Sequence, residues 1–319
     1  MERYLPQIKF IGENEQQTLF QKSVAILGLG ALGSVAAELL TRAGIGHLIL
    51  IDHDIVELSN LQRQSLYDES DINKMKAKAA FEKLEKINSE VTFTLSTAHI
   101  TRDNTSLLKA DIILDCTDNM ETRFVINEFC KKNNLSWVHA AASGSIGVVL
   151  PVSDIYCFNC VYGHAKNGMT CNDAGILNTT AYTTASIQVT EAIKILLNKP
   201  HSHLIRFDLW NNTFDHVKVK QAPNCMVCKG ITNGKESFTL SRCNTGVYSA
   251  KPNKSIAIDI NKIKNAYETI RETPIAVFIK VHGVEVLVYN YGELVFKQFR
   301  DEEKIKKLAK EIYEVGSNH

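Results

Sequence analysis

The chain has 319 residues and a formal net charge of +1, with 22% charged and 45% hydrophobic residues. This length is enough for a sizeable core and predicts one large domain plus a smaller one. The nearly balanced charge argues against a nucleic-acid or membrane-surface partner. Neither an apolar run of the signal-peptide type nor a stretch of transmembrane length is visible, so we expect a protein of the cytoplasm.

The first part of the chain has the pattern of a Rossmann-type strand–helix–strand unit. Apolar strands are expected over residues 24–27 and 47–52, and the string GLGALG and a helix of small residues over 34–43 lie between them. Glycines in this string permit a tight turn, close approach of phosphate and close helix packing. The pattern indicates an adenine-containing nucleotide, and taken alone it also suits an NAD-dependent oxidoreductase.

Further helices and strands alternate along the large domain. The expected helices cover residues 13–20, 71–87, 121–132 and 183–197. The expected strands cover residues 91–98, 111–115, 136–141 and 145–152, with a hairpin at 204–208 and 215–220. We therefore predict a doubly wound, Rossmann-like α/β domain over residues 1–230.

The pattern changes after the last of the paired cysteines. Residues 229–235 are expected to form a linker. Beyond it we expect a helix over 260–271, strands over 276–281, 284–289 and 294–299, and a charged helix over 302–315. Residues 236–319 are therefore predicted to form a small α+β domain.

Four of the eight cysteines form two CxxC pairs, Cys157 with Cys160 and Cys225 with Cys228. This spacing is typical of a closed, tetrahedral four-thiolate zinc site with a structural role. Two disulfides are the competing interpretation, but a reducing compartment disfavours them.

Several strings carry a resemblance to a known family. They are GLGALG, IDHD, SNLQRQ beginning at Ser59, NKMKAK around Lys76, DCTDN beginning at Asp115, and the two CxxC pairs. In this order, over roughly residues 1–230, the chain resembles the ThiF/MoeB family of adenylating enzymes, which are related to ubiquitin-activating enzymes.

The resemblance implies roles for individual residues. Asp52 would hold the ribose, Asn60 and Arg63 would contact phosphate, Lys76 would bridge phosphate oxygens, and Asp118 would position Mg²⁺. The implied set of ATP-contacting residues is Gly28, Gly30, Ala31, Gly33, Asp52, Asn60, Arg63, Lys76, Asp118 and Asn119. It also assigns the four paired cysteines to Zn²⁺.

The residue types suit the implied chemistry. A C-terminal carboxylate has a pKa of about 3.5 and is ionised at neutral pH, so its activation needs no general base. The difficulty is to bring this anion against a triphosphate, which calls for cations and Mg²⁺ aimed at the α-phosphate. Arg63, Lys76 and Asp118 meet that need, whereas hydride transfer would require none of them. Taken alone, Arg63 or Lys76 would be interpreted as an exposed surface charge, and Asp118 as a helix N-cap.

Two further positions follow from the resemblance. Cys171 stands in a string similar to the family's TCxxAG, which implies a reactive thiol in covalent sulfur transfer, although a lone cysteine is more often a buried packing residue. Family members commonly begin RYxRQ, with the second arginine reaching the nucleotide site of the partner in a homodimer. Pro6 stands at that position, which leaves open what replaces the arginine.

The expected reaction converts ATP and a carrier-protein carboxylate into an acyl-adenylate and pyrophosphate. We favour a ubiquitin-like sulfur carrier of the ThiS type, used in thiamine thiazole synthesis, because the C-terminal appendage and the string FDLW at 207–210 resemble thiamine-type members. The molybdopterin carrier MoaD is the near alternative, and a short peptide substrate is a more remote one. A sulfur donor such as a cysteine desulfurase would be a second partner. An oxidoreductase and a non-catalytic scaffold are the alternatives from other classes.

Overall fold

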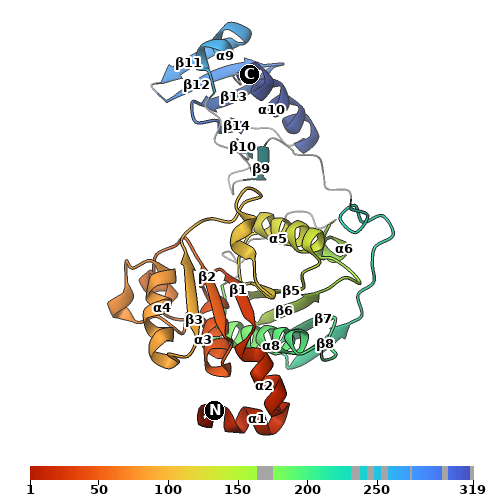
Figure 1. The fold of residues 1–319 in the computed structure, drawn as a ribbon. Coiled ribbons are helices and arrows are strands. Elements are labelled where there is room, and N and C mark those ends of the chain that lie inside the picture. The colour runs from red at the N-terminus through yellow and green to blue at the C-terminus, as the bar shows by residue number, and fades with distance from the viewer. Residues whose placement is uncertain are drawn as a thin grey trace. The chain divides into compact units, whose positions relative to one another are not determined.

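The computed structural model describes residues 1–163, 175–230, 238–242, 248–252, 258–273, 275–296 and 301–316. The chain divides into two compact units, Met1–Thr232 and Asn233–His319 (Figure 1).

The first unit is built on an eight-stranded sheet with the order β3-β2-β1-β4-β5-β6-β7-β8. The strands are β1 (Ser23–Leu27), β2 (His47–Ile51), β3 (Thr92–Ser96), β4 (Ile112–Asp115), β5 (Trp137–Ser143), β6 (Ile146–Val152), β7 (Leu204–Asp208) and β8 (Thr213–Val217). Pairing is parallel from β3 to β5 and antiparallel from β5 to β8. The chain order reverses between β1 and β4, so this sheet has the switch point of a doubly wound fold.

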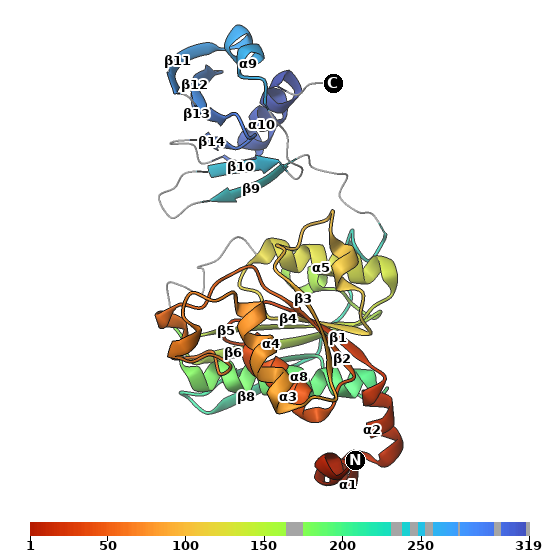
Figure 2. The same cartoon turned by 60° about the vertical axis from the view of Figure 1, so that its left-hand side comes forward.

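Helices cover both faces of this sheet, as the two views in Figures 1 and 2 show. The described helices of this unit are α1 (Leu5–Ile11), α2 (Glu13–Phe20), α3 (Gly33–Ala43), α4 (Lys76–Ile87), α5 (Met120–Asn133), α6 (Phe158–Tyr162) and α8 (Asn178–Leu196). Short 3₁₀ turns are η1 (Glu2–Tyr4), η2 (Leu58–Asn60), η3 (Glu69–Asp71) and η4 (Thr105–Leu108). Helices α3, α4 and α8 pack on one face, and α5 and α6 pack on the other.

The apolar runs of the central strands explain this layering. Val24 and Ile26 of β1 belong to the core under α3 and α8, whereas Ala25 and Leu27 face the core under α5. Successive strand residues point to opposite faces, so a strand buried on both sides must be apolar throughout. The predicted α/β fold is therefore confirmed.

One predicted helix begins later than the sequence suggests. The helical spacing starts at residue 71, but α4 begins only at Lys76. The side chain of Asp71 is instead used to accept a hydrogen bond from the amide of Asp68 and to pair with Lys74. Short polar side chains that bond nearby backbone groups compete with helix formation in this way.

The second unit has a six-stranded sheet with the order β11-β12-β13-β14-β10-β9. Its elements are β9 (Phe238–Arg242), β10 (Tyr248–Pro252), α9 (Ile260–Ala266), β11 (Glu268–Thr273), β12 (Ala276–Val281), β13 (Val284–Tyr289), β14 (Leu294–Phe296) and α10 (Glu302–Gly316). All of its pairs are antiparallel, and α9 and α10 pack on one apolar face. The predicted α+β character is confirmed. The helix expected over 260–271 ends at Ala266, because residues 268–273 pair with β12.

Within the described residues, none of the helices is long and apolar enough to cross a membrane.

Candidate nucleotide site and four-cysteine cluster

The glycine string forms the turn between β1 and α3 at the switch point. Gly28 has a φ of +82°, and its amide donates to the carbonyl of Ile51 over 2.9 Å. A Cβ atom at position 33 would lie 1.8 Å from the carbonyl oxygen of Gly28, and one at position 28 would lie 2.8 Å from that of Cys116. The turns that follow β1 and β4 therefore touch through their backbones, and side chains at these glycines would separate them.

Asp52 connects this turn to the end of β2. Its carboxylate is buried and accepts hydrogen bonds from the amide of Leu29 over 2.6 Å and from the amide of Asp54 over 2.8 Å. The side chain predicted to hold a ribose thus lies directly against the glycine turn. Parallel strands β2, β1 and β4 end at the same edge of the sheet, so the loops after them share this edge.

The SNLQRQ string lies in η2 and the turn after it. Asn60 is buried, and its side-chain oxygen accepts from the amide of Glu57 over 3.2 Å, which closes the 3₁₀ turn. Arg63 donates from Nη1 to the carbonyl of Ser59 over 2.9 Å. This hydrogen bond holds the guanidinium group through Nη1, and its other N–H groups can still donate to a ligand.

Lys76 is the first residue of α4 and is held by a carboxylate that the sequence did not single out. Its side chain is only 8% exposed, and Nζ lies 2.9 Å from Oδ2 of Asp54. Burial raises the pKa of Asp54, but the hydrogen bond and charge of Lys76 outweigh it, so that pKa lies below its ordinary value. The ammonium is thus positioned by an ionised partner two residues beyond Asp52.

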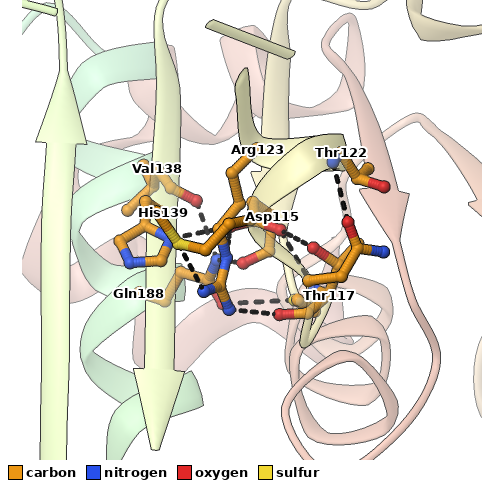
Figure 3. Close-up of polar contacts among 10 residues, drawn as sticks. Asp115, Thr117, Thr122, Arg123, Val138, His139 and Gln188 are labelled. Carbon is orange, nitrogen blue, oxygen red and sulfur yellow. Dashed lines mark hydrogen bonds and ion pairs between the residues drawn. The ribbon is translucent and has the colours of Figure 1, made fainter. Parts of the chain in front are cut away.

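The turn after β4 is organised by the buried Asp115 (Figure 3). Oδ1 accepts from the amide of Thr117 over 3.0 Å and from its hydroxyl over 2.6 Å. Oδ2 accepts from Nε of Arg123 over 3.2 Å, and Nδ1 of His139 lies 2.7 Å away from it. Arg123 also donates to the carbonyl of Thr117 over 2.5 Å, so it braces this turn.

Asp118 and Asn119 complete the turn. Asn119 caps α5 by accepting a hydrogen bond from the amide of Thr122 over 2.8 Å. Asp118 is exposed, and its carboxylate has no hydrogen-bond or ion-pair partner among the described residues. A free carboxylate at the carboxyl end of β4 is an oxygen ligand of the kind that Mg²⁺ takes.

The two CxxC pairs come together on the α5 side of the sheet. The Sγ atom of Cys157 lies 3.8 Å from that of Cys160 and 3.4 Å from that of Cys225, and Cys160 lies 3.6 Å from Cys228. All four are free thiols. Sulfurs 2.3 Å from a central zinc in a tetrahedron are about 3.8 Å apart. The cluster is therefore compatible with zinc, and in this structure none of its four cysteines forms a disulfide.

The model of the ThiF family matches residues 4–227, which is more than half of the chain. The match includes every nucleotide-site residue described above and three of the four clustered cysteines, and Cys228 lies one residue beyond it. The chain belongs to the ThiF family.

Two curated relatives of this ThiF-family chain carry the same name. The chain is 38% identical over 216 residues to the sulfur carrier protein ThiS adenylyltransferase of Bacillus subtilis, covering 65% of this chain and 64% of that protein, which is less than two thirds of its length. It is 34% identical over 238 residues to the Escherichia coli protein of the same name, covering 72% of this chain and 95% of that protein.

A solved structure supports the fold of this family member. A crystal structure of MccB from Escherichia coli superposes with a TM-score of 0.64 at 23% identity, covering 71% of this chain and 72% of that chain. At this identity the similarity concerns the fold alone.

Two predicted positions have separate outcomes. Cys171 lies outside the described residues. Pro6 lies in the first turn of α1, and Arg3 donates from Nη1 to the carbonyl of Ile87 over 2.6 Å, at the end of α4 opposite to Lys76. Within its own chain Arg3 is therefore engaged away from the glycine turn.

The structure also adds residues that the sequence analysis missed. Asp54 had a local signal, since it stands in the IDHD string two residues after Asp52. His139 had none, because its contact with Asp115 joins neighbouring strands 24 residues apart in the sequence.

Proposed function

We propose that this protein uses ATP to adenylate the C-terminal carboxylate of a ubiquitin-like sulfur-carrier protein of the ThiS type, releasing pyrophosphate. Membership of the ThiF family and the names of the two curated relatives support an adenylyltransferase. The observation that carries the proposal is the shared edge of the sheet: Arg63 and Lys76 lie in the segment that follows β2, the glycine turn follows β1, and Asp118 follows β4. These parallel strands all end at that edge.

The proposed step needs charge stabilisation and no proton transfer. A carboxylate oxygen of the carrier attacks the α-phosphorus of ATP, the new P–O bond forms, and the bond from the α-phosphorus to the oxygen bridging the α- and β-phosphates breaks. Electrons of that bond leave with pyrophosphate. Arg63 and Lys76 neutralise charge on the phosphates, while backbone amides of the glycine turn approach them closely. Asp52 binds the ribose.

Asp118 is proposed to hold Mg²⁺, helped by the position that Asp115 imposes on the turn. A bound Mg²⁺ would supply Lewis-acid stabilisation of the phosphate oxygens. Lys76 starts from its ion pair with Asp54. This ion pair holds the ammonium group toward the site before ATP binds. When nucleotide binds, a phosphate oxygen replaces Asp54 as the partner of Lys76 or shares the ammonium group with it.

Four further assignments belong to the same proposal. Cys157, Cys160, Cys225 and Cys228 bind one structural zinc, and the thiols fit the reducing cytoplasm. Cys171 forms a covalent link during sulfur transfer, with sulfur supplied by a donor such as a cysteine desulfurase. The enzyme works as a homodimer. Residues 1–230 carry the adenylation chemistry, and the small domain over 236–319 is an appendage.

The deciding experiment measures carrier-dependent exchange between ATP and labelled pyrophosphate, with and without Mg²⁺. Asp118→Asn should lower the exchange rate at least about 100-fold, the loss typical of a group that stabilises transition-state charge. Asp154→Asn is the matched control, because Asp154 is exposed just after β6, which runs antiparallel to β5 and ends at the opposite edge. Undiminished exchange in Asp118→Asn would refute the site assignment.

The same assay separates the alternatives. Exchange with a MoaD-type carrier but not with a ThiS-type carrier would change the partner and keep the reaction. Carrier binding without exchange would indicate a scaffold. A change in NADH absorbance with no exchange would indicate an oxidoreductase.

A further inference from the structure

His139 is a buried histidine that the proposed chemistry does not use. It lies on β5 with only 2% of its surface exposed. Its ring packs edge-on against Phe158 of α6 at a centroid distance of 5.0 Å and against Tyr162 at 5.6 Å. The edge that carries Nδ1 faces Asp115, 2.7 Å from Oδ2 (Figure 3). The aromatic rings hold the imidazole in a single orientation toward this carboxylate.

Both carboxylate oxygens of Asp115 accept two hydrogen bonds each, and the donors come from different parts of the chain. Thr117 supplies two of them and Arg123 supplies a third, and both residues belong to the segment that directly follows Asp115 in the chain. His139 supplies the fourth from a different strand. Among these donors it is the one that ties the turn to the body of the sheet.

The protonation state of the pair follows from its surroundings. Burial raises the pKa of Asp115, but the Arg123 guanidinium and the hydrogen bonds to the carboxylate outweigh it, so that pKa lies below its ordinary value. Burial lowers the pKa of His139 below its ordinary value of about 6.5, and the nearby Arg123 acts in the same direction, against the opposing effect of Asp115. At neutral pH a neutral imidazole faces an ionised carboxylate, which requires the hydrogen to be on Nδ1.

The backbone continues directly from this pair to the proposed magnesium ligand. Thr117 is held by Oδ1 of Asp115, and Asp118 is the next residue. The exposed carboxylate of Asp118 has no partner among the described residues to orient it. Its position therefore depends on how firmly Asp115 holds the turn.

We propose that His139 is a positioning residue for nucleotide binding: by donating from Nδ1 to Asp115 it fixes the turn that presents Asp118. This inference rests on the proposed function, because Asp118 matters only if Mg²⁺ and ATP bind there. His139 acts through Asp115 and does not itself contact substrate.

The test compares three variants in the pyrophosphate-exchange assay. His139→Leu removes the donor, and the concentrations of Mg²⁺ and ATP for half-maximal rate should rise about tenfold, the factor for one hydrogen bond to a charged group. His139→Asn should restore most of the affinity, since its amide can donate to the same oxygen. Val138→Ala is the structural control on β5, because the side chain of Val138 is fully buried in the core on the opposite face of the strand from His139. It should lower the unfolding temperature and leave the Mg²⁺ requirement unchanged.

Equal shifts in His139→Leu and Val138→Ala, or no rescue by His139→Asn, would overturn the inference. A second readout is independent of activity. In protein labelled with ¹⁵N-histidine, the ring resonances that disappear in His139→Asn should show a neutral ring protonated at Nδ1 at pH 7. A ring protonated at Nε2 or at both nitrogens would overturn the inference even if exchange is normal. Absence of exchange in the wild type with an Nδ1-protonated ring would instead refute the proposed function alone.

Discussion

Adding one methyl group at Gly33 should destabilise the first unit much more than adding it at Gly30. In Gly33→Ala the new Cβ would lie 1.8 Å from the carbonyl oxygen of Gly28, and real Cβ atoms hardly ever approach another atom within 3.0 Å. The start of α3 must therefore move by more than an ångström. Neither neighbour can yield easily, since the amide of Gly28 is bonded to Ile51 and the new methyl would also lie 3.3 Å from Cβ of Cys116.

The magnitude follows from the cost of overpacking. Forcing extra volume into a packed site costs about 1–3 kcal/mol or more, and the gain in helix propensity from glycine to alanine returns less than about 1 kcal/mol. We expect a net loss of about 2 kcal/mol in the free energy of unfolding for Gly33→Ala. For a unit of this size the unfolding temperature should fall by roughly 4–8 °C.

Two control variants separate stability from nucleotide binding. In Gly30→Ala the nearest atom to the new Cβ would be Nε2 of Gln64 at 3.7 Å, an ordinary contact, so stability should hardly change. Its methyl group should nevertheless weaken ATP binding, because the second glycine of the fingerprint lets phosphate approach the backbone. In Gly46→Ala the Cβ would lie 1.9 Å from the carbonyl oxygen of Phe20, away from the glycine turn, so stability should fall while ATP affinity is kept.

The assay is thermal unfolding followed by circular dichroism, with ATP affinity measured by calorimetry well below the transition. A Gly33→Ala protein that unfolds within about 1 °C of the wild type would refute this reasoning, because the expected shift is several degrees. A Gly30→Ala protein less stable than Gly33→Ala would refute it as well.

The other predictions concern cysteines. The purified wild type should contain one zinc per chain by metal analysis, and Cys225→Ser should lose most of it and unfold at a lower temperature; a folded wild type with four reactive thiols in the cluster and no metal would contradict this. Cys171→Ser should still form the acyl-adenylate, because adenylation needs no thiol, but mass spectrometry after incubation with carrier, ATP and a sulfur donor should detect no covalent adduct. Survival of the adduct would exclude Cys171 as its site.

The sequence alone identified the family and the fold because both are expressed in local patterns. The apolar run before GLGALG indicates a buried parallel strand, and the spacing of the glycines indicates the turn that follows it. The spacing within each CxxC pair lets both thiolates bind the same metal ion, so the two pairs together indicate a four-thiolate site. The strings SNLQRQ and DCTDN added specificity, since such strings in this order are rare by chance.

Other features depended on which segments become neighbours in space. The pairing of Lys76 with Asp54, and of His139 with Asp115, joins residues 22 and 24 positions apart. The IDHD string marks Asp54 but not the partner that it meets, and nothing in the local pattern distinguishes His139 from a packing residue. The strand at residues 268–273 also escaped prediction, because its helical spacing was overridden by pairing with β12. Local sequence determines periodicity and turns, whereas burial and strand order decide which charged groups meet, since only a desolvated charge requires a specific partner.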